Sequence, residues 1–139
     1  MTEAEILKTY HTVAVVGLSN DPMRASLSVA KYMQDHGYRI IPVNPDETEV
    51  LGEKAYPDLA SVPEPIEIVD LFKRSEHVPP FVDEAIAIGA KVVWMQSGIA
   101  NAEAAARARA AGLEVIEDTC IRTAHRRLMA SDADWASKT

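Results

Sequence analysis

The sequence lacks the features that mark a secreted or membrane-inserted chain. Its single cysteine, Cys120, excludes an internal disulfide and a cysteine-rich zinc site. No apolar run approaches the roughly 20 residues that a membrane span needs. The first ten residues include Glu3, Glu5 and Lys8 and do not have the pattern of a signal peptide. These absences predict a protein of the reducing cytoplasm that does not enter a membrane.

The chain also lacks an excess of basic residues. It has 14 lysines and arginines against 21 aspartates and glutamates, and its net charge is −7. A nucleic-acid-binding protein needs a basic face to displace phosphate counterions, so we expect no nucleic-acid partner. The four histidines show no spacing such as H-E-x-x-H, so we expect no metal site. An anionic small ligand would need a local positive site.

The length of the chain, 139 residues, allows one sizeable core and is too short for two independent ones. We therefore expect a single domain over residues 1–139. Five short apolar runs have the character of buried strands. They lie at residues 12–16, 38–43, 66–72, 91–95 and 113–116.

Segments with helical spacing alternate with these strands. The expected helices lie at residues 2–10, 26–36, 81–88, 102–111 and about 119–128, the third of them after Pro79 and Pro80. Thr2, Ser26 and Asn101 are the expected N-caps of the first, second and fourth helices. Residues 44–65 contain five prolines or glycines, which predicts a crossover without a long helix.

This alternation predicts a Rossmann-like α/β fold, doubly wound, with a mainly parallel sheet of about five strands and helices on both faces. Open sheets of this kind bind ligands beyond the carboxyl ends of their strands, at the topological switch point. The loops that follow the strands are therefore where function is expected.

The loop after the first strand, residues 17–26, is the strongest candidate for a phosphate site. Gly17 permits close approach of a ligand to the backbone, and the following helix offers free N–H groups. Arg24 would grip phosphate oxygens, and the Ser26 hydroxyl would donate one more hydrogen bond. The alternative is that Gly17 only makes a tight turn and Ser26 only caps a helix.

The same loop lacks the dinucleotide fingerprint G-x-G-x-x-G, because Ser19 and Pro22 stand where its second and third glycines would be. The second strand ends in Asn44 and Pro45, where an NAD protein usually presents an acid, although two acids follow closely. Both features disfavour NAD. The two prolines that flank Val43 and Asn44 are equally typical of a plain turn.

The next two strands are followed by further candidates. Phe72 offers an aromatic surface to a base, and Lys73 and Arg74 add two cations, although such a pair is also typical of a solvated loop. Gln96 supplies an amide, and Gly98 supplies a backbone that a ligand can approach closely. A plain turn between strand and helix explains these last two residues equally well.

Cys120 falls in the first turn of the expected last helix, where the helix dipole favours a thiolate. Arg122 and Arg126 would add to this effect, and Asp118 would oppose it. Free cysteines pack more often than they react. Both roles stay open for this residue.

Taken together, these stretches resemble the small, free-standing CoA-binding proteins related to the N-terminal CoA-binding domain of succinyl-CoA synthetase α subunits. The resemblance covers nearly the whole chain and rests on the order and spacing of several motifs. They are VAVVGLS at residues 13–19, PVNP at 42–45, LG at 51–52, YP at 56–57, VDLFKR at 69–74, GAK at 89–91, WMQSGI at 94–99 and DTCI at 118–121.

The resemblance implies that the ligand is coenzyme A or an acyl-CoA. It places the phosphates against the loop from Gly17 to Ser26, with Leu18, Ser19 and Arg24, and the pantetheine arm toward Gln96 and Gly98. It places the adenosine against Val43, Asn44 and Pro45, and it lines the groove with Phe72, Lys73, Arg74 and Val78. Such proteins usually have phenylalanine-arginine after the third strand, so either Lys73 or Arg74 contacts phosphate. CoA carries a 3′-phosphate, which suits an acid-free, cation-bearing site better than NAD does.

The sequence contains no G-x-S-x-G elbow, no P-loop and no convincing acid–base pair, so we expect a binding or regulatory protein rather than an enzyme. Two alternatives stay open. One is a thiol-exchange or acyl-relay enzyme that uses Cys120, and the other is an NAD(P)-binding protein. The apolar helix faces are compatible with a homodimer as well as with one core.

Overall fold

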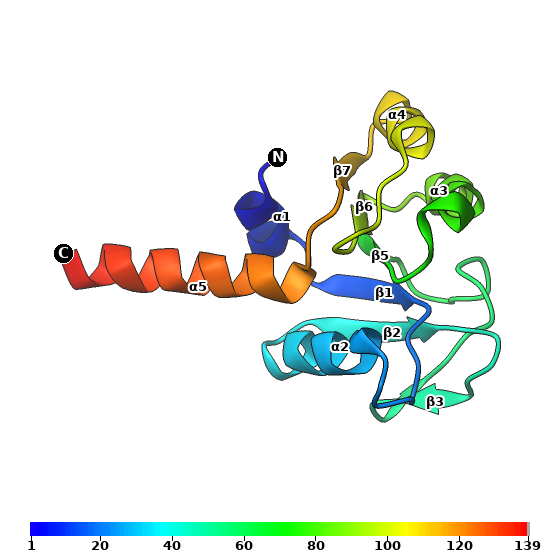
Figure 1. Ribbon diagram of the computed structural model, residues 1–139, viewed down its shortest axis with the longest axis horizontal. Helices are drawn as coiled ribbons and strands as arrows, with labels where there is room; N and C mark the ends of the chain where they lie inside the picture. The colour runs from blue at the N-terminus through cyan, green and yellow to red at the C-terminus, as the bar shows by residue number, and fades with distance from the viewer. Residues whose placement is uncertain (139) are drawn as a thin grey trace.

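At the centre of the molecule lies a five-stranded, wholly parallel sheet (Figure 1). The computed structural model describes the backbone of residues 1–138 and the side chains of residues 1–132. In spatial order the strands are β2 (Arg39–Val43), β1 (Thr12–Val16), β5 (Ile68–Leu71), β6 (Val92–Met95) and β7 (Glu114–Ile116). The winding reverses between β1 and β5, which makes this pair the topological switch point. The predicted Rossmann-like α/β fold is confirmed.

Helices cover both faces of the sheet (Figure 1). One face packs against α3 (Val78–Ala87) and α4 (Ala102–Ala110). The other packs against α1 (Glu3–Thr9), α2 (Ala25–Asp35) and α5 (Ile121–Lys138). Side chains of a strand point alternately to the two faces, and both faces are covered, so the strands have few polar residues.

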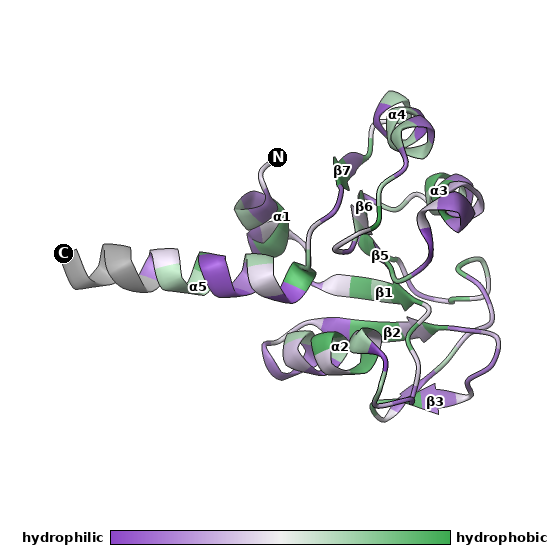
Figure 2. Ribbon diagram, viewed as in Figure 1, coloured by the Kyte–Doolittle hydropathy of each residue, from purple (hydrophilic) through white to green (hydrophobic). Residues whose placement is uncertain are grey.

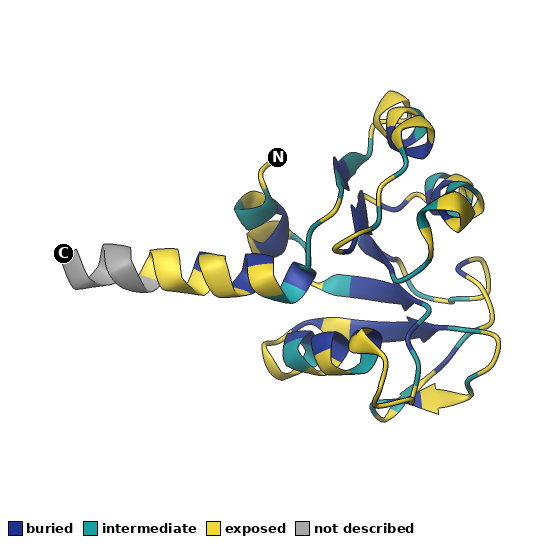
Figure 3. Cartoon of the chain, viewed as in Figure 1, coloured by how far each residue is buried: buried dark blue, intermediate teal, exposed yellow. Residues whose placement is uncertain are grey.

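The colouring of the chain by hydropathy and by burial shows the same division. β1 is almost continuously apolar and buried, whereas the outward sides of the helices are polar and exposed (Figures 2 and 3). Within residues 1–138, none of the helices has both the length and the apolar character that crossing a membrane requires.

The crossover from β2 to β5 has no long helix, as predicted, and it contains a short hairpin that was not predicted. Its strands, β3 (Glu49–Val50) and β4 (Glu53–Lys54), pair antiparallel. Leu51 and Gly52 join them with φ angles of 55° and 77°, the left-handed conformation that a two-residue turn of type I′ requires. The hairpin is tied to the loop after β1, because Asn20 Nδ2 donates a hydrogen bond to the Glu49 carbonyl oxygen at 2.8 Å.

Three predicted helix boundaries are wrong. α2 begins at Ala25 with Arg24 as its N-cap, so Ser26 lies inside the first turn and caps nothing. α3 begins at Val78 and takes the two following prolines into its first turn, where a missing backbone N–H costs nothing. α5 begins at Ile121, two residues after the expected start, and its backbone continues to Lys138, ten residues past the expected end at Leu128.

Gly17 leaves β1 between the ends of its two neighbours. Its backbone N donates to the Val43 carbonyl oxygen at 2.8 Å, and Phe72 N donates to the Val16 carbonyl oxygen at 3.0 Å. The φ of Gly17 is +88°, and a Cβ atom here would lie 2.6 Å from the Phe72 carbonyl oxygen. Only glycine fits, because both the backbone conformation and the contact exclude a side chain.

A buried polar chain runs from the sheet to α5. Asp70 lies on β5 between Val15 and Trp94 of the adjacent strands and is 2% exposed. It accepts a hydrogen bond from Gln96 Nε2, and Gln96 Oε1 accepts one from Ile121 N at 3.3 Å. Burial raises the pKa of the Asp70 carboxyl to about 7, because the hydrogen bond from Gln96 only partly offsets the loss of solvent.

We predict that Gly17→Ala lowers the free energy of unfolding by on the order of 2 to 4 kcal/mol, because the added methyl group meets a carbonyl oxygen in a strained backbone. Urea unfolding measures the change. Gly37→Ala is the matched control: its φ is +92° but its Cβ position is open, so it carries only the backbone strain. Equal losses for the two variants would contradict the importance of the close contact.

We also predict that Asp70 makes the protein less stable as the pH rises from about 4 to about 7. The unfolded chain releases this proton near the ordinary pKa of 3.8, whereas the native protein retains it up to about 7. The free energy of unfolding should fall by about 1.4 kcal/mol per pH unit from this group alone. Urea unfolding over this range should show a flatter pH profile for Asp70→Asn than for the wild type. Parallel profiles would refute the assignment.

Candidate functional site

The loops after β1, β5 and β6 enclose a cleft of about 610 Å³ at the carboxyl edge of the sheet. This volume is typical of sites for small organic ligands. The cleft lies where the strand pattern predicted, at the switch point between β1 and β5. Its lining residues are Gly17, Arg24, Ala25, Ser26, Phe72, Lys73, Arg74, Ser75, Gly98 and Ile99.

A recess of about 250 Å³ continues this cleft toward the end of β2. The two hollows share Gly17, Arg24 and the run Phe72, Lys73 and Arg74. The recess adds Asn44, Asp46 and His77 to the lining. Together they form one groove along the ends of β2, β1, β5 and β6. From here on, the cleft means this whole groove, with the recess included.

The first turn of α2 borders the cleft. Its N-cap, Arg24, makes no capping hydrogen bond from its side chain, and Ala25 and Ser26 line the cleft. The first N–H groups of a helix have no partner inside it, and the helix dipole makes this end positive. An anion placed here would therefore be bound by backbone donors as well as by Arg24.

The loop that leads to α2 is ordered by hydrogen bonds of its own. Ser19 N donates to Ser26 Oγ at 3.3 Å, and Asp21 N donates to Ser19 Oγ at 3.0 Å. Asn20 donates from its backbone N to Glu47 Oε2 at 2.8 Å and from its side chain to the same atom. Sequence reasoning missed Asn20, because its partner is 27 residues away and no local pattern reveals it.

Three cationic side chains from two loops border the cleft, namely Arg24, Lys73 and Arg74. Arg24 lies 3.8 Å from an Asp21 carboxylate oxygen and stays 70% exposed, so this pair holds it weakly. Lys73 Nζ lies 5.6 Å from the centre of the Phe81 ring. Among the side chains of residues 1–132, neither Lys73 nor Arg74 forms a salt bridge. The cleft is thus a local concentration of positive charge on an acidic chain.

Three expected ligand contacts have buried side chains. Val78 is completely buried because α3 begins at this residue and turns it toward the sheet, so its side chain lines no groove. Leu18 is also fully buried, in the core under α2. Gln96 is 4% exposed and its amide is committed to Asp70 and Ile121 rather than facing a ligand.

The end of β2 also differs from the prediction. Val43 is buried and Pro45 is exposed, while Asn44 is half-buried and donates from Nδ2 to the Leu18 carbonyl oxygen at 3.1 Å. The expectation of an acid-free site is wrong, because Asp46 lines the recess. A turn places it there, since Asp46 N donates to Asn44 Oδ1 at 2.9 Å.

Cys120 lines a separate cavity of about 120 Å³ rather than the cleft. The residue is half-buried and stands immediately before α5, not inside its first turn as predicted. The same cavity is lined by Ser97, Asp118 and Arg127. It adjoins the cleft at Gly98, whose backbone N donates to Asp118 Oδ1 at 2.6 Å.

Comparisons with known proteins agree with this fold. The chain is 47% identical over 121 residues to the uncharacterized protein YneT of Bacillus subtilis. The aligned residues make up 87% of this chain and 90% of YneT. It superposes on a hypothetical protein from Pyrococcus horikoshii with a TM-score of 0.88 and 42% identity, over 93% of both chains.

Larger proteins contain a similar domain. The chain is 32% identical over 82 residues to the alpha subunit of acetate–CoA ligase [ADP-forming] II of Pyrococcus furiosus, which is 58% of this chain and 18% of that one. The apo structure of a dinucleotide-forming acetyl-coenzyme A synthetase 1 of Ca. Korarchaeum cryptofilum matches with a TM-score of 0.69 and 26% identity, over 77% of this chain and 26% of that one. The model of the CoA binding domain family matches residues 11–126. The chain therefore belongs to the CoA binding domain family.

Proposed function

We propose that this protein binds CoA or an acyl-CoA in the cleft, as a binding or regulatory domain spanning residues 1–139. The observation that supports this most is the convergence of Arg24, Lys73 and Arg74 with the open first turn of α2. CoA carries a diphosphate and a 3′-phosphate, and guanidinium groups and free backbone N–H groups are the donors that bind such anions.

The shape of the cleft suits a long ligand of this kind. In the proposed arrangement the diphosphate lies at the centre, against Gly17 and the start of α2. The nucleoside end lies in the recess beside Asn44 and His77. The pantetheine arm extends past the aromatic ring of Phe72 toward Ile99, along the less polar end.

The recess contains an acid, Asp46, so the cleft does not exclude NAD by the lack of an acid. An acid at the end of the second strand is what NAD-binding folds use for the ribose diol, so its presence here does not favour CoA. Charge and family favour CoA instead. Three cations face one acid in the cleft, which suits a ligand rich in phosphate, and the family is a CoA-binding one.

The side chains around the cleft favour binding over catalysis. The Ser26 hydroxyl accepts a hydrogen bond from Ser19 N, and the Ser75 hydroxyl accepts one from Ala100 N at 3.1 Å. Among the described side chains, neither serine hydrogen-bonds to a histidine or a carboxylate that would activate it as a nucleophile. Cys120 lies in the adjoining cavity, so thiol exchange with the ligand remains the alternative and not the proposal.

A competitive thermal-shift titration tests the proposed ligand. CoA should raise the melting temperature more than dephospho-CoA does at the same concentration, because the latter lacks the 3′-phosphate, and more than NAD or NADP. Cys120→Ser is the control and should respond to CoA as the wild type does. Stabilisation by NADP alone would overturn the proposal, and a response lost in Cys120→Ser would favour the thiol-exchange alternative.

Arg24→Ala should weaken CoA binding by about 1 to 3 kcal/mol if the guanidinium makes a charge-assisted phosphate contact. This corresponds to a dissociation constant roughly 5- to 150-fold higher by titration calorimetry. Met23→Ala is the matched control, because Met23 is the adjacent residue, is 90% exposed and lines no part of the cleft. An unchanged dissociation constant for Arg24→Ala would remove this residue from the site.

A further inference from the structure

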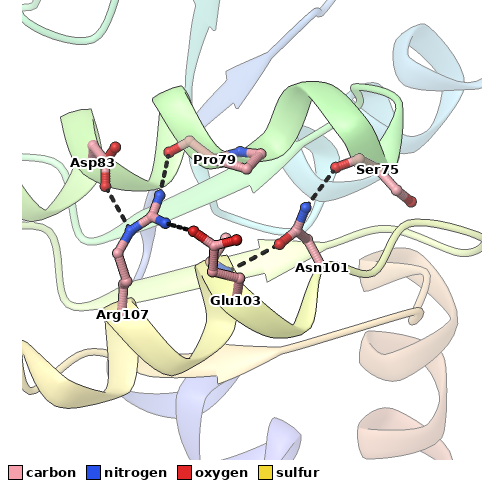
Figure 4. Close-up of polar contacts among 7 residues, drawn as sticks. Ser75, Pro79, Asp83, Asn101, Glu103 and Arg107 are labelled. Carbon is pink, nitrogen blue, oxygen red and sulfur yellow. Dashed lines mark hydrogen bonds and ion pairs between the residues drawn. The ribbon is translucent and has the colours of Figure 1, made fainter.

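The loop that carries two of the three cations is held at its far end by the loop between β6 and α4. Ser75 directly follows Arg74 and lines the cleft itself. Its hydroxyl accepts a hydrogen bond from Ala100 N at 3.1 Å. Its carbonyl oxygen accepts one from Asn101 Nδ2 at 3.1 Å, which Figure 4 shows. Both donors come from the loop after β6, so the loops on either side of the cleft are joined at this residue.

Asn101 performs two tasks with one amide group. Its Oδ1 accepts a hydrogen bond from Ala104 N at 3.0 Å and so caps α4, while its Nδ2 donates to Ser75 (Figure 4). Its backbone N donates to Glu117 Oε2 at 3.3 Å. Serine or aspartate would cap the helix equally well, but neither carries an N–H donor on its side chain. The cap alone therefore does not explain why an amide stands here.

The contact with Ser75 fixes the backbone next to the cations. Lys73 and Arg74 have long side chains without salt bridges among the described residues, and such side chains lose freedom when they bind a ligand. A loop fixed before binding reduces that loss, because the direction of both side chains is already limited by the backbone. Asn101 lies outside this loop and limits it through its hydrogen bond to the Ser75 carbonyl oxygen.

We propose that Asn101 is a positioning residue of the cleft, which through Ser75 holds the loop of Lys73 and Arg74 in the arrangement that binds ligand phosphates. This inference rests on the proposed function, CoA binding. Asn101 does not line the cleft and acts only through the neighbouring loop. The hydrogen bond between Asn101 and Ser75 could not be predicted from the sequence, because 26 residues separate the two partners.

Arg107 offers a matched control on the same pair of helices. It donates from Nε to Asp83 Oδ1 at 3.1 Å, from one terminal nitrogen to Glu103 Oε1 at 2.7 Å and from the other to the Pro79 carbonyl oxygen at 3.5 Å (Figure 4). It thus joins α4 to α3 without touching the loop of Lys73 and Arg74, which we call the cation loop. A variant at Arg107 loosens the helix pair but leaves Ser75 held.

The test compares Asn101→Ser with Arg107→Gln by titration calorimetry with CoA at about 50 and about 300 mM NaCl. Asn101→Ser keeps a neutral capping oxygen and removes the amide Nδ2–H that donates to Ser75, since the serine hydroxyl is one bond shorter. We expect its dissociation constant for CoA to rise roughly tenfold at low salt, with a weaker dependence on salt because the cations contribute less. Arg107→Gln should keep both the affinity and the salt dependence of the wild type.

Urea unfolding of the same variants separates positioning from general destabilisation. Asn101→Asp is the second variant, which keeps a strong cap but lacks the donor, and it should weaken CoA binding at least as much as Asn101→Ser. Wild-type affinity and salt dependence in both Asn101 variants would overturn the inference and leave CoA binding intact. Equal loss of affinity in Arg107→Gln would also overturn it. Absence of CoA binding by the wild type would instead overturn the proposed function.

Discussion

Gly17 leaves β1 with room for backbone only, since the Phe72 carbonyl oxygen lies where its Cβ would be. The contact is set by hydrogen bonds at the carboxyl ends of β2, β1 and β5, which draw the three strands together at the edge of the sheet. Everything that faces the cleft follows this point in the chain. The loop to α2 begins at Gly17 itself, and the cation loop begins at Phe72. The geometry of the site is therefore a consequence of how three strands end.

The second constraint is electrostatic. A chain of net charge −7 places Arg24, Lys73 and Arg74 on one cleft, together with the positive end of α2. An anion here is bound by local donors, and the overall charge of the protein acts mainly on the rate of association. The loops that carry these cations are each tied to a neighbour, the first through Asn20 and the second through Ser75. Because the loop backbones are already fixed, only the long side chains of the cations lose freedom on binding.

Sequence reasoning succeeded where one local pattern decides the structure. The strand at residues 12–16 has the predicted bounds because a parallel strand covered on both faces is continuously apolar. Thr2 and Asn101 cap their helices as predicted, since capping depends on nearby backbone groups. The order of strands and helices was enough to locate the cleft at the switch point.

Some errors arose where a partner far along the chain decides. The Gln96 amide was expected to face the ligand, but it donates a hydrogen bond to the buried carboxyl of Asp70, 26 residues away. The second bond of Asn101, to Ser75, is a contact of the same kind, which spacing in the sequence does not encode. Two other errors come from helix starts that were placed too late. Val78 was expected in the groove, but α3 begins there rather than at residue 81, and Ser26 was expected at a cap, but α2 begins at Ala25.

The central claim is that the cleft selects CoA through its phosphates. Native mass spectrometry of the full chain, mixed with equal concentrations of CoA, dephospho-CoA, NAD and NADP, tests it most directly. The account predicts that the bound form carries the mass of CoA ahead of the other three. A complex with NADP in preference to CoA, or no complex with any of them, would contradict it.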